Sequence, residues 1–381
     1  MNNKAGLYVH LPFCNSKCPY CDFLSISASD SLKLQYIDAL KQELQAWSKK
    51  PETASLLFRS LYLGGGTPTL IPPKGLAELI AYALGLFQWI EQPEITMEAN
   101  PESVTNDKLK IVKDAGINRI SFGMQSMNEK GLKILGRLHN VSSAIKSFNL
   151  AKQIGFNSVS VDLIYGWPSQ TPEGWHKELE AILALRPDHI SCYELTLESN
   201  TPFYKTVSQG RLALPDETII LEMMDIMEDI LKNHGYVHYE ISNFALPTKE
   251  CIHNLGYWNN LPYIGIGASA ASYIPPTRMK QSENVHEYIK KIQKNDFSQD
   301  YSETLTHEQG FREAVIIGLR KVAGIDIKKL EAAWKINVLD YYGDTITQLI
   351  NGGLLGLEDN QRLKLSKRGR RVSNVIFSKL V

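Results

Sequence analysis

Three cysteines near the start of the chain constrain its fold and chemistry more than any other feature. Cys14, Cys18 and Cys21 have C-x3-C-x2-C spacing and directly follow an apolar run at residues 7–11. On a short loop, this spacing brings three thiolates around one point, where they can bind a soft metal centre. An iron–sulfur cubane takes cysteine thiolates and normally needs four of them. Three thiolates from one loop would therefore leave one iron open to a further ligand.

Two other uses of these cysteines have weaker support. A structural zinc site usually takes two pairs of cysteines, whereas Cys192 and Cys251 are isolated in the sequence. A disulfide framework is disfavoured because the chain has five cysteines and no secretory feature. We therefore expect an open iron–sulfur site, and a zinc site is the alternative.

The composition argues against several classes of protein. Lys plus Arg and Asp plus Glu are both 41, so the net charge is zero and no global basic field attracts nucleic acid or anionic lipid. No segment approaches the ~18 uninterrupted apolar residues of a membrane span, and the N-terminal residues lack the long apolar core of a signal peptide. We expect reduced thiols, a cytoplasmic location and no nucleic-acid partner. The basic segment 364–371 is a local exception.

The first half of the chain alternates between strand-like and helix-like segments. This alternation predicts an α/β fold with a parallel sheet and right-handed crossovers, and it leaves a partial barrel and a doubly wound sheet as alternatives. In both topologies, functional residues gather at the C-terminal ends of the strands. We expect strands at residues 7–11, 60–63, 94–98, 119–123, 158–164 and 189–195, and helices at residues 31–47, 74–87, 106–115, 129–135, 142–154 and 172–185.

The second half of the chain is less regular. A helix is expected at 216–234 and a strand at 236–241, followed by irregular structure at 243–273 and a solvated helix and connection at 280–300. The last part resembles a small winged-helix module, which we expect to be a docking or cap domain. Its expected elements are helices at 308–320, 327–334, 339–351 and 369–380 and two short strands around a polar turn at 357–365. The expected domains are residues 1–200, 201–300 and 301–381.

Several predicted strands end in residues that could hold a ligand. Three glycines at 64–66 would let a ligand approach the backbone, where N–H groups could bind a carboxylate, although most glycine triplets only mark turns. Glu98 ends the third strand and could accept hydrogen bonds from ribose hydroxyls. Asp162 lies within an apolar strand, where a charge needs a partner or a ligand. Gln125 ends the fourth strand, and the guanidinium of Arg137 could bind a carboxylate bidentately.

The cysteine spacing, with Tyr20 before the last cysteine, resembles the signature of radical S-adenosylmethionine (SAM) proteins. Segments 8–14, 64–69 and 162–166 are similar to those of the oxygen-independent coproporphyrinogen III oxidase family. The resemblance implies a partial (β/α)6 barrel with a small α+β winged-helix-like domain, one [4Fe-4S] cluster on the three cysteines, and SAM at the fourth iron. It implies cofactor contacts at Tyr8, Tyr20, Gly65, Gly66, Thr67, Glu98, Gln125, Arg137 and Asp162, with Thr196 and Ala271 at two further aligned positions.

Three features resemble the heme-chaperone branch of this family, HemW, more than the oxidase itself. Phe23 stands two residues after Cys21, where the oxidase has another cysteine, and only a short segment precedes Tyr8. The motif His-Asn-x-x-Tyr-Trp begins at His253. An imidazole can ligate heme iron, and aromatic side chains can pack on a porphyrin face. The resemblance implies that His253 contacts heme, with Cys251 as an alternative ligand.

The same resemblance implies a heme chaperone that transfers heme to acceptor haemoproteins of respiration at the membrane, with a homodimer that depends on the cluster. The alternative is an oxygen-independent coproporphyrinogen III oxidase, which converts two propionates to vinyls by oxidative decarboxylation. Phe23 argues against that activity, and the sequence leaves open whether SAM is cleaved. A DNA-binding regulator that uses the C-terminal module is a third alternative, which the zero net charge disfavours.

Overall fold

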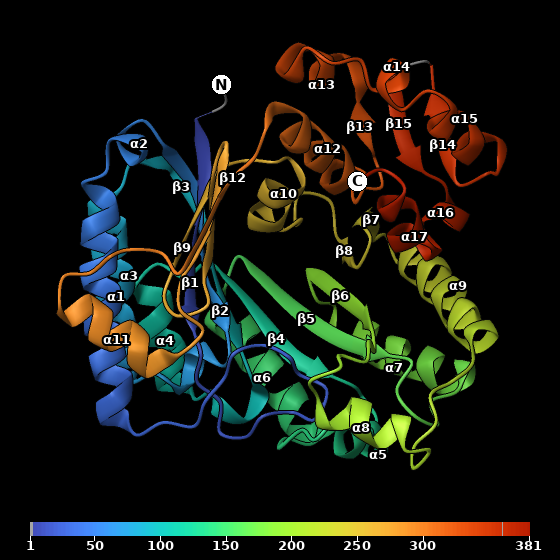
Figure 1. The fold of residues 1–381 in the computed structure, drawn as a ribbon. Helices are drawn as coiled ribbons and strands as arrows, with labels where there is room; N and C mark the ends of the chain where they lie inside the picture. Colours follow the sequence, from blue (N-terminus) through green and yellow to red (C-terminus); the bar gives the residue numbers. More distant parts are fainter. Residues whose placement is uncertain (1–2, 360) are drawn as a thin grey trace.

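The computed structural model of the protein describes residues 3–359 and 361–381. Within these residues, a 12-stranded sheet forms the centre of the molecule, in the order β12-β11-β10-β9-β1-β2-β3-β4-β5-β6-β8-β7 (Figure 1). Its middle strands are parallel and follow one another in chain order, which confirms the predicted α/β fold with a parallel sheet. They are β1 (Lys4–Leu11), β2 (Leu57–Gly65), β3 (Trp89–Ala99), β4 (Arg119–Gln125), β5 (Ser158–Tyr165) and β6 (His189–Glu194).

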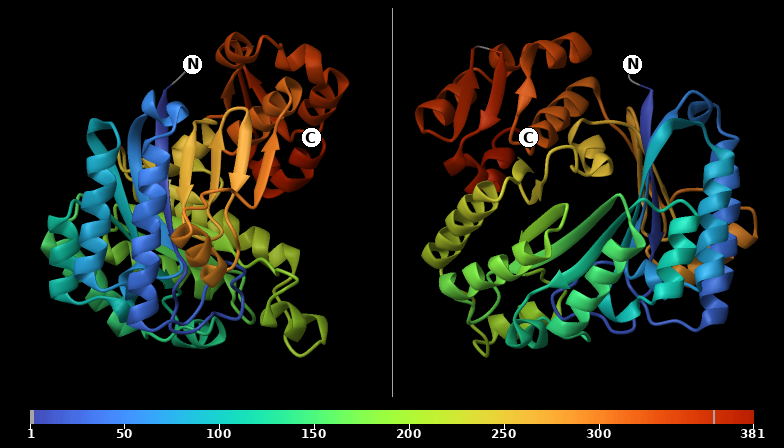
Figure 2. Two further views of the ribbon diagram at one scale, coloured as in Figure 1. Left: turned by 60° about the vertical axis from the view of Figure 1, so that its left-hand side comes forward. Right: turned by 180° about the vertical axis from the view of Figure 1, so that it is seen from behind.

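Helices cover the outer face of these strands (Figure 2). The first helix begins where Ser29 accepts a hydrogen bond from Leu32 N at 3.3 Å, which satisfies one free amide of the first turn. Tyr36, Leu40 and Leu44 recur every four residues on its buried face. All predicted helices of this layer agree with the structure to within one residue at each end. The layer comprises α1 (Asp30–Ser48), α2 (Pro51–Ala54), α3 (Pro73–Leu86), α4 (Asn106–Asp114), α5 (Glu129–Ile134), α6 (Val141–Ile154) and α7 (Pro172–Leu185).

The two faces of β1 have different environments. Leu7, Val9 and Leu11 are fully buried in the core beneath the helices. The residues between them point to the inside of the curved sheet, because successive side chains of a strand alternate between faces. Tyr8 lies there opposite Tyr62 of β2, with which its ring stacks. The inner face therefore carries the polar and aromatic side chains that a site could use.

The segment 243–273 is not irregular, and that expectation was wrong. It contains β8 (Asn243–Ala245), α10 (Ile252–Trp258), β9 (Tyr263–Ile266) and β10 (Ala271–Ile274). β9 pairs in parallel with β1, and β10, β11 (Thr277–Lys280) and β12 (Tyr301–Thr304) continue the sheet as antiparallel strands. Each of these strands has only three or four residues. Such short segments show no periodic pattern, and their pairing with distant strands decides their structure.

The flanking elements follow the predictions more closely. The expected helix and strand are present as α9 (Glu217–Asn233) and β7 (Val237–Glu240), while α8 (Pro202–Ser208) was not expected. The helix expected within 280–300 is α11 (Val285–Gln293), but it is not fully solvated. Its Tyr288 and Ile292 are buried, and the helix contacts α1.

The C-terminal domain combines helices with a small antiparallel sheet of order β13-β15-β14, as a winged-helix-like module would. Gly343, with a φ of 45°, divides the helix predicted at 339–351, and the helix predicted at 369–380 is also divided. Residue 360, in the predicted polar turn, lies outside the described residues. The elements are α12 (His307–Gly318), β13 (Ile325–Asp326), α13 (Ile327–Trp334), α14 (Val338–Tyr342), α15 (Asp344–Asn351), β14 (Leu355–Glu358), β15 (Arg362–Leu365), α16 (Lys367–Arg371) and α17 (Ser373–Ser378).

Ion pairs attach the C-terminal domain to α9. Arg370 Nη2 donates to both carboxylate oxygens of Glu228, at 3.1 and 3.2 Å. Lys367 Nζ lies 2.6 Å from Asp225 Oδ1, and Arg371 pairs with the same carboxylate. Much of the basic segment 364–371 is thus engaged in ion pairs within the molecule, which favours a docking role for this domain.

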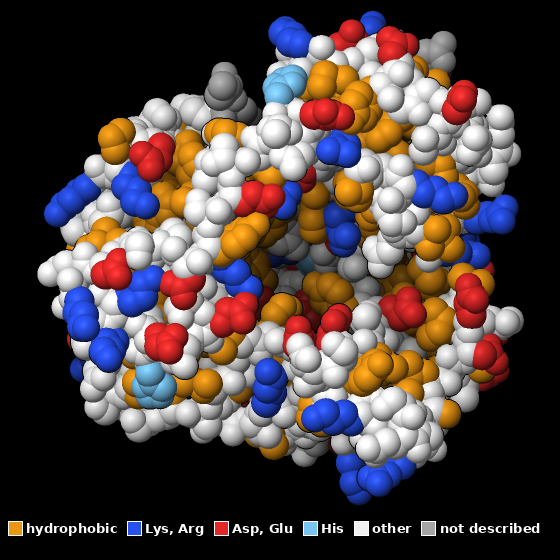
Figure 3. Space-filling model, in the orientation of Figure 1, with side chains coloured by type: hydrophobic (Ala, Val, Ile, Leu, Met, Phe, Trp, Pro, Cys, Tyr) orange, Lys and Arg blue, Asp and Glu red, His pale blue; other side chains and the backbone are white. Residues whose placement is uncertain are grey.

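In the orientation of Figure 1, the molecular surface has a hollow between the C-terminal domain and the central strands (Figure 3). Side chains of both charges are spread over the same face, in keeping with the zero net charge of the chain. In the described part of the chain, every helix is too short or too polar to span a membrane.

Replacing Arg370 with Ala is expected to lower the free energy of unfolding by about 1–3 kcal/mol, because the mostly buried Glu228 loses a charged hydrogen-bond donor. Urea denaturation measures the change. The exposed Lys328→Ala variant serves as the control, with an expected change within about 0.5 kcal/mol. Equal stabilities of the two variants would mean that the ion pair does not hold the domain.

Candidate functional site

The cysteine loop leaves β1 and is closed at its neck by backbone hydrogen bonds. Cys14 N donates to Ile26 O at 3.0 Å, and Ile26 N donates to Pro12 O at 2.8 Å. Cys14, Cys18 and Cys21 all line one cavity of about 620 Å³ at the C-terminal ends of the parallel strands. Other residues predicted for the site line the same cavity, namely Tyr20, Gly65, Gly66, Thr67, Glu98, Gln125, Arg137, Asp162 and Thr196.

The three thiols are a donor set that an iron–sulfur cluster can use. Among the described residues, no three Cys, His, Asp or Glu side chains are grouped so that they could hold one ion. A cubane takes each cysteine on a different iron, so its ligands surround it and need not converge on one point. Burial raises the pKa of the Cys14 and Cys21 thiols, so a positive metal centre would be needed to deprotonate them. The donor set and the cavity therefore fit an iron–sulfur cluster.

Arg137 joins the cysteine loop to the ends of the strands. Its Nη1 donates to Cys18 Sγ at 3.4 Å, and its Nη2 donates to Asn100 Oδ1 at 2.6 Å and to Gly123 O at 3.0 Å. Its Nε is buried without a hydrogen-bond partner among the described residues. A guanidinium that lines a cavity beside a cysteine thiol can stabilise negative charge there.

Asn100 is a site residue that the sequence reasoning missed. Its Nδ2 donates to Thr67 Oγ1 at 2.9 Å, and Thr67 Oγ1 in turn lies 3.7 Å from Cys14 Sγ. Asn100 therefore connects the loop after β2 with Arg137 across the cavity. The available signal was its position directly after the third strand, where polar residues of a parallel sheet gather.

The glycine loop after β2 differs from the expectation in one respect. Gly65 N donates to Glu98 Oε2 at 3.0 Å, Gly66 N donates to Leu11 O at 3.0 Å, and Thr67 N donates to Phe13 O at 2.7 Å. These amides are engaged within the protein, so they are not free to bind a carboxylate as expected. The glycines line the cavity and also allow close packing. A Cβ on Gly65, whose φ is 110°, would lie 2.4 Å from the ring of His10.

Two carboxylates line the inside of the cavity. Glu98 accepts hydrogen bonds from Tyr62 Oη at 2.8 Å and from Gly65 N, and Asp162 accepts from Ser121 Oγ at 3.0 Å. Burial raises the pKa of Glu98 to about 7, and the Asp162 carboxylate adds to the shift. Burial also raises the pKa of Asp162. Asp162 has the partner that its apolar strand required, and Glu98 can change charge near neutral pH.

Gln125 ends β4 in a left-handed conformation, with a φ of 65°. The pairing of β4 with β5 shifts between Gly123 and Gln125. The side chain folds back over Gly123, where an added Cβ would lie 2.9 Å from Gln125 Nε2. The irregular strand end therefore turns the amide of Gln125 toward the cavity that it lines.

Three other predicted residues do not line this cavity. Tyr8 lies farther down the inner face of β1, where its hydroxyl is 2.8 Å from His10 Nδ1. Ala271 is exposed on β10. His253 lies on α10, a short helix that packs against β1 and β2 on the inside of the sheet.

His253 is buried and fully hydrogen bonded. Its Nδ1 lies 2.9 Å from Ser60 Oγ and its Nε2 lies 2.9 Å from Tyr257 Oη. Its ring stacks on that of Tyr62, with 5.0 Å between centroids. Burial lowers the pKa of His253 to about 3, so the imidazole is neutral. A neutral imidazole is the form that ligates iron, but both nitrogens have protein partners in this structure.

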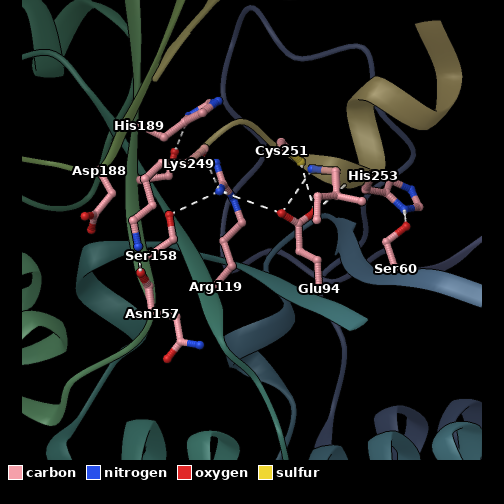
Figure 4. A network of polar contacts seen from close by, with 12 residues as sticks. Ser60, Glu94, Arg119, Asn157, Ser158, Asp188, His189, Lys249, Cys251 and His253 are labelled. Carbon is pink, nitrogen blue, oxygen red and sulfur yellow. Dashed lines mark hydrogen bonds and ion pairs between the residues drawn. The ribbon is translucent and has the colours of Figure 1, made fainter. Parts of the chain in front are cut away.

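A buried ion pair holds the start of the His253 helix (Figure 4). Glu94 accepts hydrogen bonds from Ile252 N at 3.1 Å and from His253 N at 3.0 Å. Its carboxylate lies 3.7 Å from Arg119 Nη1, which also donates to Lys249 O at 2.9 Å. A carboxylate suits this position because the first amides of a helix are unpaired.

Cys251 belongs to the same network. Its Sγ lies 3.5 Å from Glu94 Oε1, and burial raises the pKa of its thiol. Only 3% of the residue is exposed. The thiol therefore has a protein partner, and Cys251 does not line the cavity of the other cysteines.

The raised pKa of Glu98 predicts a pH dependence of stability. The pKa of this carboxyl is about 7 in the folded protein and returns to its ordinary value of 4.5 on unfolding, so the folded state binds more protons between these values. Stability should then fall as the pH rises through that window, by up to about 3 kcal/mol from this group. The Glu98→Gln variant should lack this part of the slope.

Urea denaturation of the protein without cluster or SAM, between about pH 5 and about pH 8, measures both slopes. The exposed Glu91→Gln variant is the control and should keep the slope of the unchanged protein. A Glu98→Gln variant with the same slope as the control would show that Glu98 is ionised throughout.

Comparisons with known proteins agree with this site. The model of the radical SAM superfamily matches residues 8–182, and that of the HemN C-terminal domain matches residues 305–372. The heme chaperone HemW of Lactococcus lactis is 35% identical over 374 residues, which cover 98% of this chain and 96% of that protein. HemW of Bacillus subtilis is 34% identical over 375 residues, which cover 97% of each.

A solved structure has the same fold over nearly the whole chain. Coproporphyrinogen III oxidase (HemN) from Escherichia coli, described as a radical SAM enzyme, superposes with a TM-score of 0.85 at 25% identity. The match covers 99% of this chain and 90% of that one. With HemW relatives at this identity and coverage, the chain belongs to the HemW family within the radical SAM superfamily.

Proposed function

We propose that this protein is a heme chaperone that binds one [4Fe-4S] cluster, SAM and heme, and transfers heme to acceptor haemoproteins. The observation that carries the proposal is the single cavity that collects the three loop cysteines, Glu98, Arg137 and Asp162. The HemW relatives, which match almost the full chain, support the role in heme transfer. We further infer a cytoplasmic protein that meets its acceptors at the membrane surface and forms a homodimer.

Different residues of the cavity would hold the cluster and SAM. Cys14, Cys18 and Cys21 would ligate the cluster, and Arg137 would stabilise negative charge beside Cys18. Glu98 would accept hydrogen bonds from the ribose of SAM, for which its carboxylate lies at the cavity wall. When bound, the cluster would supply an electron and an iron with an open coordination position for the amino and carboxylate groups of SAM. The protein contributes the orientation of these groups and a partly enclosed environment.

Heme would bind at the His253 helix in a conformation more open than this one. The space beside His253 and Tyr257 measures only about 10 Å³, which is too small for a porphyrin. Tyr257 and Tyr263 stack edge to face there, with 4.7 Å between ring centroids. Displacing α10 would expose these aromatic rings to a porphyrin face and free one nitrogen of His253 for iron.

The alternative function is the oxidase reaction on coproporphyrinogen III. The structural similarity to HemN is the observation in its favour. Phe23 stands at the rim of the cavity with 68% of its surface exposed. An apolar side chain at this position can neither ligate metal nor transfer a proton. This side chain supports porphyrin binding without decarboxylation. The oxidase would convert two propionates to vinyl groups, whereas the chaperone would form no vinyl product.

Replacing Cys18 with Ala should abolish the cluster, because a cubane on two cysteines has two open irons. Iron and sulfide analysis after anaerobic reconstitution should give about four of each per chain in the unchanged protein and less than about one in the variant. The Cys192→Ala variant removes a buried thiol that lies outside the cavity and should keep its cluster. A Cys18→Ala variant that retains four irons would contradict the assignment.

Replacing His253 with Ala should weaken heme binding by at least about tenfold, because it removes the neutral imidazole that would ligate iron. Anaerobic titration followed by the Soret band measures the affinity, and coproporphyrinogen turnover is assayed on the same reconstituted sample. The exposed His286→Ala variant should bind heme as the unchanged protein does. Vinyl product without a stable heme complex would overturn the chaperone function in favour of the oxidase.

A further inference from the structure

We propose that Tyr62 is a positioning residue shared by the cofactor cavity and the His253 helix, so that SAM binding and iron ligation by His253 oppose each other. The inference rests on the proposed function, which places SAM in the cavity and heme at His253.

On the side of the cavity, Tyr62 contacts the carboxylate that SAM would meet. Its hydroxyl donates to Glu98 Oε1 at 2.8 Å, while Gly65 N donates to Glu98 Oε2 at 3.0 Å. Glu98 lines the cavity together with the loop cysteines. Burial raises the pKa of Tyr62 far above its ordinary value, so the hydroxyl stays a donor. A ligand that requires an ionised Glu98 in this position therefore also favours the Tyr62 hydrogen bond.

On the other side, the ring of Tyr62 lies against His253. The two rings are nearly parallel, with 28° between their planes and 5.0 Å between centroids. Tyr8 stacks on Tyr62 from β1 at 6.1 Å. A Cβ on Gly6 would lie 3.2 Å from the imidazole, so β1 leaves only enough room for the ring. His253 is thus enclosed by Tyr62, by β1 and by its two hydroxyl partners.

SAM and heme require different arrangements of His253, so each ligand should weaken the binding of the other. Iron ligation needs a free nitrogen, so His253 must leave the hydroxyl of Ser60 or of Tyr257, and the displacement of α10 takes its ring off the stack on Tyr62. SAM needs Glu98 held in its present position, and the Tyr62 hydroxyl helps to hold it. SAM therefore stabilises the closed arrangement of His253, whereas heme requires the open one. A ligand shifts such an equilibrium only through its different affinity for the two arrangements, and the effect is reciprocal.

The test is an anaerobic heme titration of the cluster-loaded protein with and without saturating SAM, with the cluster kept oxidised so that SAM is not cleaved. In the unchanged protein, SAM should raise the heme Kd by about fivefold or more. In the Tyr62→Phe variant, which keeps the ring but lacks the hydroxyl, the two Kd values should agree within about twofold. Heme should weaken SAM binding of the unchanged protein by the same factor, a measurement that needs no variant.

The control is Tyr82→Phe, which removes another tyrosine hydroxyl, the donor to Gln45 Oε1 at 2.9 Å between two outer helices. This variant should keep the full effect of SAM. The inference is overturned if the unchanged protein binds both ligands independently, or if Tyr62→Phe keeps the effect. Failure of the unchanged protein to bind heme or SAM would instead overturn the proposed function, so the two failures are distinct.

Discussion

The parallel pairing of β1 with β2 determines where every part of the site lies. In this register Gly6 faces Ser60, Tyr8 faces Tyr62 and Leu11 faces Gly65. The strand ends therefore place the cysteine loop beside the glycine loop, and the inner faces of the same strands form the wall against which His253 packs. A shift by one residue would turn each of these side chains to the opposite face of the sheet.

Much of this arrangement could be predicted from local patterns. The six parallel strands and their helices follow from alternating segments long enough to show a period, and the position of functional residues at strand ends follows from the topology. Glu98 and Asp162 reach the same cavity as the cysteines for that reason, whereas Arg137 reaches it from the loop after α5. The roles of these residues rest on the family resemblance, because a carboxylate or a guanidinium that lines a cavity fits several ligands.

Contacts between segments far apart in the chain could not be predicted from local sequence patterns. The strands β9 to β12 are too short to show a period, and β9 becomes a strand through its pairing with β1 and β10. The use of the Gly65 and Gly66 amides within the protein, and the connection of Asn100 to Arg137, depend on the closed cysteine loop. The place of α10 depends on Glu94 and Arg119, two charges whose burial no local pattern indicates.

The environment of His253 suits a protein that must release its cargo. Any iron that this imidazole ligates displaces the hydroxyl of Ser60 or of Tyr257, and the same hydroxyl recovers its partner when the iron leaves. One such hydrogen bond contributes about 1 kcal/mol, which corresponds to about a fivefold loss of affinity relative to a free imidazole. The enclosure by Tyr62 and β1 adds to this cost, because the ring must move before it can bind. A heme-storage protein would bind more tightly with a preformed open site. A heme-transfer protein instead gains from an iron ligand such as His253, whose imidazole recovers a hydrogen bond within the protein when the heme leaves.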